Sequence, residues 1–168
     1  LEQTEFLKSF EIAIQLGAIL SVAVLYAKVL LRHRTLWLKL LAAFFPTAVF
    51  GALLYKVVKR YLMAGEGVVL ASLFLGGIFL ILFEEFHRTR ADAVSDLNAI
   101  SYRQAFWIGV AQSVAMVPGV SRAAATVIGG MAVGIERRVI VEFSFLLALP
   151  TMTAATALDL FKSASVFQ

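Results

Sequence analysis

The stretch PGVSR, from Pro118 to Arg122, interrupts an apolar run and decides how the helices around it are arranged. Pro118 ends the preceding helix because it has no amide N–H and collides with the turn before it. Gly119 permits a sharp backbone turn, and Ser121 is a good N-cap for a new helix. The free N–H groups of that helix would point back at the break. Arg122 adds a planar set of donors that matches phosphate oxygens in pairs, so the stretch predicts a phosphate-binding site.

The composition is that of a helical membrane protein. Of the 168 residues, 61% are hydrophobic and only 15% are charged, whereas in a soluble domain about half are apolar and about a quarter are charged. The apolar residues form continuous runs and do not alternate with the period of two that is typical of barrel strands. The chain has no cysteine, which excludes disulfides and cysteine–metal sites. The net charge of +4 indicates basic cytoplasmic loops and not nucleic-acid binding.

Long apolar runs predict an all-α, polytopic membrane fold with about four transmembrane helices. A helix that crosses a bilayer needs about 20 apolar residues. The runs that meet this requirement predict membrane spans at residues 10–31, 37–57, 68–83 and 139–160. We expect all of them to belong to one transmembrane domain, residues 1–168, in a fragment of a longer protein.

Two shorter apolar pieces lie on either side of the break, at residues 102–117 and 122–133. Neither comfortably crosses a hydrocarbon core of about 30 Å at about 1.5 Å per residue. The sequence therefore predicts a re-entrant helical hairpin over residues 102–133, with PGVSR at its tip. Broken helices at this depth are tolerated only where they are buried in protein or line a cavity. The alternative is one long kinked span.

The distribution of Lys and Arg predicts the orientation of the chain in the membrane. The loop after the first span contains Lys28, Arg32, Arg34 and Lys39. Cytoplasmic loops carry the excess of basic residues, so this loop should be cytoplasmic. The hairpin opens on the same face of the membrane and should therefore enter from the cytoplasmic side. Two of the spans begin with a carboxylate and enter from opposite sides, as expected of an inverted-topology repeat with its site at the repeat interface.

The residues around the break form a candidate phosphate cradle. Thr126 follows Arg122 by one helical turn, so both side chains can face one cavity. Gln112, on the preceding half-helix, would complete the polar lining, together with Ser121 and the backbone at Gly119. An arginine at membrane depth is costly, which favours a functional role for it.

Three further residues are secondary candidates. Glu11 and Gln15 lie one turn apart near the start of the first span, and Glu142 lies near the start of the last. Glu11 and Gln15 could bind a metal or water, or could simply begin an interfacial helix. A structural ion pair of Arg122 with Glu142 or Glu11 is the alternative to phosphate binding.

No metal site is predicted from the residues alone. Glu84, Glu85 and His87 end a span beside a basic, polar linker, which is typical of a solvated membrane boundary. No serine–histidine pair for nucleophilic catalysis can be placed in the chain.

Several stretches carry a resemblance to a known family. They are FEIAIQLGAIL (residues 10–20), SYRQAFWIGVAQSVAMVPGVSR (101–122), EFSFLLALP (142–150) and ATALDLFKS (155–163). In order and spacing, the chain resembles the bacterial undecaprenyl-diphosphatases, or bacitracin-resistance proteins, over essentially its whole length. It departs from them after Ser121 and Arg122, where the family usually has Ser-Gly-Ala-Thr and this chain has Ala123-Ala124-Ala125-Thr126.

The resemblance implies a hydrolase of the bacterial plasma membrane. It would convert undecaprenyl diphosphate to undecaprenyl phosphate and inorganic phosphate, which recycles the lipid carrier for peptidoglycan synthesis and confers bacitracin resistance. The implied catalytic residues of this chain are Arg122 and Ser121, and the implied cofactor is a divalent cation, Mg²⁺ or Ca²⁺. The partners would be the polyprenyl diphosphate and membrane lipids, with no nucleic acid and with a homo-oligomer left open.

The family also has a motif, E-G-x-T-E-F-[LI]-P-[VI]-S-S-T-G-H, that contributes acidic residues, serine and histidine to the catalytic centre. We expect this motif upstream of Leu1, so residues 1–168 alone should be inactive. The residues by themselves leave a second function open. Broken helices and a mid-membrane anion site are also typical of transporters, here of a polyprenyl phosphate or another anion.

Overall fold

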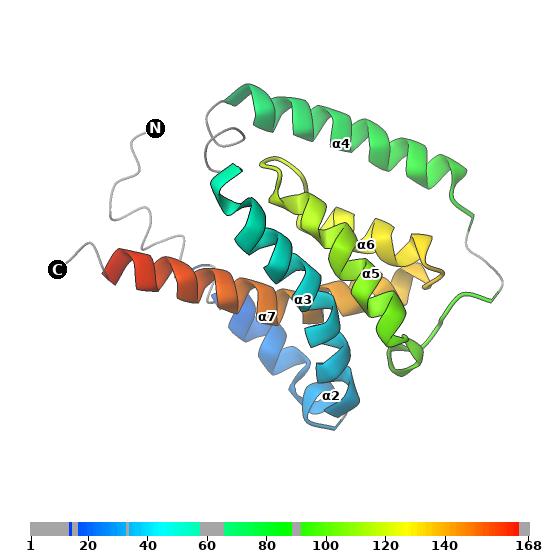
Figure 1. The fold of residues 1–168 in the computed structure, drawn as a ribbon. Helices are drawn as coiled ribbons and strands as arrows, with labels where there is room; N and C mark the ends of the chain where they lie inside the picture. Colours follow the sequence, from blue (N-terminus) through cyan, green and yellow to red (C-terminus); the bar gives the residue numbers. More distant parts are fainter. Residues whose placement is uncertain (1–13, 15–16, 33, 58–65, 89–91, 165–168) are drawn as a thin grey trace.

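The computed structural model describes residues 14, 17–32, 34–57, 66–88 and 92–164, and every regular element in these ranges is a helix (Figure 1). Residues 17–25 are helical. The elements that follow are α2 (Ala27–Arg32), α3 (Arg34–Val57), α4 (Glu66–Phe86), η2 (Leu97–Ala99), α5 (Tyr102–Ser113), η3 (Val114–Met116), α6 (Arg122–Ala132) and α7 (Arg137–Ala164). The predicted all-α class is confirmed for this part of the chain.

Within the described part of the chain, three helices are long and apolar enough to cross a membrane: Arg34–Leu54, Gly67–Phe86 and Arg137–Ala157. They coincide with the spans predicted at residues 37–57, 68–83 and 139–160, and the protein is a multi-pass membrane protein. The first predicted span, residues 10–31, begins outside the described residues. In its described part the α-helix is interrupted by a turn at Tyr26, although the amide of Tyr26 still donates to Val22 O at 3.0 Å.

The two half-helices predicted on either side of PGVSR are present and pack against each other as α5 and α6. Gly129 on α6 allows their close approach, because a Cβ there would lie 2.3 Å from Cβ of Ala111 on α5. At the open end of the hairpin, Gln104 Nε2 on α5 donates to Val133 O, just beyond α6, at 3.1 Å. The two helices are therefore antiparallel.

The core lies between this hairpin and the long helices α3 and α7. Its fully buried apolar side chains come from α3, α5 and α7 and include Leu36, Leu40, Ala43, Ala105, Ile108, Ile140, Phe143, Leu146 and Leu147. Glycines bring the backbones together: a Cβ on Gly130 of α6 would lie 2.1 Å from Ile140 Cγ1 of α7. Small residues commonly allow helices to pack closely in membranes, where the burial of apolar surface contributes little to helix association.

Lys39 corrects one sequence-based expectation. The sequence places it in a basic loop, but it lies in α3 with a side chain that is only 8% exposed. Its Nζ donates to the backbone oxygen of Asn98 at 2.6 Å. The loop ends earlier than expected, since only residue 33 separates α2 from α3. Lys39 therefore ties the linker before α5 to α3, because a buried ammonium needs an oxygen partner.

Helix α4 stands apart from the core. It lies beside the hairpin of α5 and α6 (Figure 1), and none of the residues in its apolar window is buried. It contacts the hairpin tip, where a Cβ on Gly119 would lie 2.5 Å from Val69 O, and its Glu84 forms an ion pair with Arg137 of α7. These contacts lie toward opposite ends of α4.

Replacing Gln104 by leucine should loosen the open end of the hairpin. Gln104 Oε1 accepts a hydrogen bond from Ser101 N at 3.0 Å, and its Nε2 holds Val133 O. We expect a loss of about 1–2 kcal/mol, because leucine keeps the bulk but makes neither bond. The thermal unfolding midpoint in detergent measures this loss, with the exposed neighbour Arg103→Leu as control. Equal midpoints for the two variants would contradict this role of Gln104.

Candidate functional site

Five polar side chains from four helices meet within the apolar bundle. Hydrogen bonds between side chains join two of them in one group and the other three in a second group. A hydrogen bond from a side chain of the second group to a backbone oxygen of the first connects the two groups. We call these residues the polar cluster: Thr47 on α3, Gln112 on α5, Arg122 and Thr126 on α6, and Thr151 on α7. Because polar groups inside an apolar bundle need partners, this cluster fixes the relative positions of its helices.

Arg122 is the first residue of α6, and its partly buried guanidinium reaches across to α7. Its Nη1 donates to Thr151 Oγ1 at 2.9 Å. The Thr151 hydroxyl lies 2.8 Å from Leu147 O, to which it donates in turn. Among the described residues, Thr151 is the one side chain to which the guanidinium donates, and a guanidinium has five N–H donors. Most of its hydrogen-bonding capacity is therefore available to a ligand.

Gln112 connects Thr47 and Thr126, the two remaining residues of the polar cluster. Its Oε1 accepts from the Thr126 hydroxyl at 3.2 Å, and its Nε2 donates to Thr47 Oγ1 at 3.2 Å. The Thr47 hydroxyl donates to Gly109 O at 3.0 Å. Thr126 is only 1% exposed and its hydroxyl also lies 2.8 Å from Arg122 O, so it sits behind the site and orients Gln112.

A cavity of ≈310 Å³ opens at the polar cluster. Its polar lining consists of Thr47, Gln112, Arg122 and Thr151, and apolar Ala115, Met116, Met152 and Ala155 complete it. Arg122 is its one charged lining residue among those described, so the cavity favours an anion. Electrostatic attraction is strong here because apolar walls keep the effective dielectric constant low.

The hairpin tip has the backbone geometry predicted from the sequence. Gly119 has a φ of +93°, which favours glycine, and Ser121 caps α6 by accepting a hydrogen bond from Ala124 N at 3.3 Å. The Ser121 hydroxyl is exposed and can still donate its own proton. The predicted break and the predicted N-cap are both confirmed.

Other predicted residues are not brought to the polar cluster. Glu142 lines a separate cavity with Arg138, and Arg122 donates to Thr151 and not to Glu142. Glu11 and Gln15 lie outside the described residues. No group of three histidine, aspartate or glutamate side chains that could hold a metal occurs within the described ranges.

Sequence reasoning missed Thr47 and Thr151. Both lie on the long helices that flank the hairpin, whereas the predicted lining came from residues 102–133 alone. A signal was available, because each threonine directly follows a proline inside an apolar helix, as Pro46-Thr47 and Pro150-Thr151. A hydroxyl at a proline position in a membrane helix often satisfies a backbone or neighbouring polar group.

Comparison with known proteins agrees with the resemblance found in the sequence. An Aquifex aeolicus protein named undecaprenyl-diphosphatase is 50% identical over 167 residues, which is 99% of this chain and 65% of that protein. A relative of the same name from Persephonella marina is 47% identical over 97% of this chain and 63% of its own length. Another, from a Sulfurihydrogenibium species, is 44% identical over 99% of this chain and 65% of its own length. The chain thus spans somewhat less than two thirds of these relatives. The family model for the bacitracin resistance protein BacA matches residues 1–168 in full, and the chain belongs to that family.

Proposed function

We propose that the complete gene product containing this chain hydrolyses undecaprenyl diphosphate to undecaprenyl phosphate and inorganic phosphate. The observation that carries the proposal is Arg122, which presents free guanidinium donors to a cavity without described acidic residues. Relatives that share about half of the residues are named undecaprenyl-diphosphatase. The reaction would recycle the lipid carrier of peptidoglycan synthesis at the bacterial plasma membrane and so confer bacitracin resistance.

Arg122 would hold the diphosphate and stabilise the negative charge that develops on the transferred phosphoryl group. A guanidinium suits this role because it pairs with two phosphate oxygens at once. Ser121 and the first backbone N–H groups of α6 add donors at the same end of the helix. Preorganised donors of this kind account for much of the catalysis in phosphoryl transfer.

The remaining chemistry requires groups beyond the polar cluster. None of its five residues is a general base at neutral pH, so the group that activates the nucleophile must come from elsewhere in the complete protein. The resemblance implies Mg²⁺ or Ca²⁺, but no carboxylate among the described residues lines the cavity. The polar cluster therefore does not fit a divalent cation, and we assign it no metal-dependent step.

We also propose that α5 and α6 form a re-entrant hairpin with PGVSR near mid-membrane. With 12 and 11 residues, each helix is too short for a bilayer core of about 30 Å at about 1.5 Å per residue. Residues 10–31 would form the fourth span, and the hairpin would belong to an inverted repeat. In this arrangement the polar cluster lies where non-helical backbone is buried in protein, as the bilayer requires.

Phosphate release from undecaprenyl diphosphate in detergent tests the proposed reaction. We expect the complete gene product to release inorganic phosphate and residues 1–168 alone to release none. The assay compares samples with and without added Mg²⁺ or Ca²⁺. Substrate binding by the complete product without phosphate release would overturn hydrolysis and favour a carrier for the same lipid.

Removing the acceptor of Arg122 should weaken catalysis without removing the charge. Thr151→Val keeps the shape of the side chain but leaves Nη1 without its partner at 2.9 Å. We expect kcat/KM to fall about tenfold to a hundredfold, the usual worth of a hydrogen bond to a charged group. Thr151→Ser should restore most of the rate, and the exposed Thr153→Val should have no effect. A Thr151→Val enzyme with normal kinetics would show that Thr151 does not position Arg122.

A further inference from the structure

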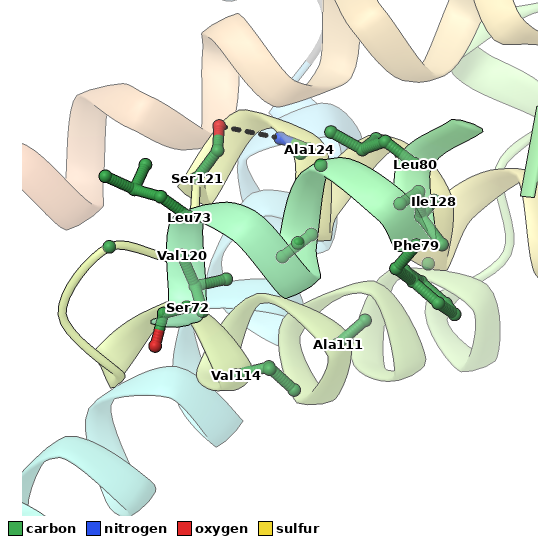
Figure 2. A pocket seen from close by; sticks show the side chains of 15 residues that line it. Ser72, Leu73, Phe79, Leu80, Ala111, Val114, Val120, Ser121, Ala124 and Ile128 are labelled. Carbon is green, nitrogen blue, oxygen red and sulfur yellow. Dashed lines mark hydrogen bonds between the residues drawn. The ribbon is translucent and has the colours of Figure 1, made fainter. Parts of the chain in front are cut away.

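A second cavity lies on the opposite face of the hairpin, between the hairpin and α4 (Figure 2). Its volume is ≈300 Å³, and small or apolar residues line it along its whole length. We call this cavity the α4 groove; its walls include Gly76, Gly77 and Phe79 of α4, Ala111 of α5, and Ala125 and Ile128 of α6. No charged residue lines it in the described part of the chain, so it suits a hydrocarbon group.

Neighbouring residues of the hairpin tip line the α4 groove and the cavity at the polar cluster. Ser121 lines the groove, and the next residue, Arg122, lines the polar cavity. Consecutive Cα atoms are about 3.8 Å apart, so one molecule can reach both sites by passing over the tip. Its end at Arg122 must be anionic, and its end in the groove must be apolar.

Resting on the function proposed above, we propose that the α4 groove binds the isoprene units next to the diphosphate of the lipid substrate. A cavity of roughly 150 Å³ holds one benzene-sized apolar molecule. The groove, at ≈300 Å³, therefore takes about two such groups, or about two isoprene units. The rest of the polyprenyl chain continues into the bilayer.

The attachment of α4 allows a chain to enter from the side. Near one end α4 meets Gly119 through Val69, and near the other Glu84 pairs with Arg137. The glycines at 76 and 77 lie between these contacts, and a Cβ on either would meet no atom within 4 Å. At these two positions no side chain of α4 narrows the groove.

Filling the groove should weaken the binding of substrate but not its turnover. Gly76→Leu places a side chain in the groove without a clash, since there is open space around that Cα. We expect KM for undecaprenyl diphosphate to rise at least about tenfold, because excluding only two methylene groups has about that effect. The value of kcat should change little. Gly67→Leu is the matched control, as Gly67 lies on the same helix with equally open space but does not line the groove.

Photolabelling distinguishes failure of this inference from failure of the proposed function. The probe is a prenyl diphosphate with a diazirine on its second isoprene unit, added to the complete gene product in detergent. We expect label on α4 and α6 that unlabelled undecaprenyl diphosphate displaces, and that Gly76→Leu reduces at least about tenfold. Displaceable label without phosphate release would support the groove while overturning hydrolysis.

Three results would overturn the groove assignment while phosphate release persists. One is an unchanged KM in Gly76→Leu. Another is label that undecaprenyl diphosphate does not displace, as expected if bilayer lipid fills the groove. The third is a lowered unfolding midpoint for Gly76→Leu but not for Gly67→Leu, which would show that another protein segment packs there.

Discussion

Replacing Arg122 by alanine should lower the rate of phosphate release by the complete gene product about a thousandfold or more. Arginine side chains that stabilise the transferred phosphoryl group have effects of this size. In this protein no second described cation lines the cavity to compensate. The protein should remain folded in the membrane, because the hydrogen bonds that join Thr47, Gln112 and Thr126 do not involve the guanidinium. The measurement is phosphate release from undecaprenyl diphosphate, with the unfolding midpoint recorded on the same samples.

One further variant separates the shape of the guanidinium from its charge, and a second serves as the control. Arg122→Lys keeps the charge but cannot donate to two oxygens in a plane, so we expect it to recover only a small part of the rate. Arg103→Ala removes an exposed arginine that lines neither cavity, and its rate should stay normal. Near-normal turnover in Arg122→Ala would show that the cavity binds no reacting phosphate.

The features predicted correctly from the sequence depend on neighbouring residues. Pro118 and Gly119 end one helix, and Ser121 begins the next, because each acts on backbone within a turn of itself. The structure has this break and this cap where they were expected. The long spans were equally accessible, since an apolar run of sufficient length is a property of one continuous segment.

The features that sequence reasoning missed depend on contacts between distant segments. Thr151 lies 29 residues after Arg122, and Thr47 lies 65 residues before Gln112. Lys39 is buried and donates to Asn98 O, which lies 59 residues further along the chain. No local pattern shows which apolar helix will face the hairpin, so the partner of Arg122 could be named only from the packed structure. For the same reason the sequence did not predict the α4 groove.

Gly109 should be the position in the core where a single added methyl group does most harm. Its Cα faces the backbone of α3 so closely that a Cβ would lie 1.9 Å from Ala43 O and 2.7 Å from Ala43 C. Gly109→Ala must therefore push α5 away from α3 and weaken the bond from Thr47 to Gly109 O. We expect a loss of about 3 kcal/mol, the upper part of the usual range for overpacking. In a chain of this size that lowers the unfolding midpoint by roughly 6–12 °C.

The prediction is specific to Gly109, because the atoms that an added Cβ would meet differ from one glycine to another. At Gly130 the obstacle is the Ile140 side chain, at 2.1 Å, whereas at Gly67 nothing lies within 4 Å. A side chain can rotate away, but the carbonyl of Ala43 is held in the middle of α3. The midpoint in detergent should therefore fall most for Gly109→Ala, less for Gly130→Ala and not at all for Gly67→Ala. Equal midpoints for Gly109→Ala and Gly67→Ala would mean that α3 and α5 can separate freely. In that case the alignment of Thr47 with Gln112 would depend on something other than this contact.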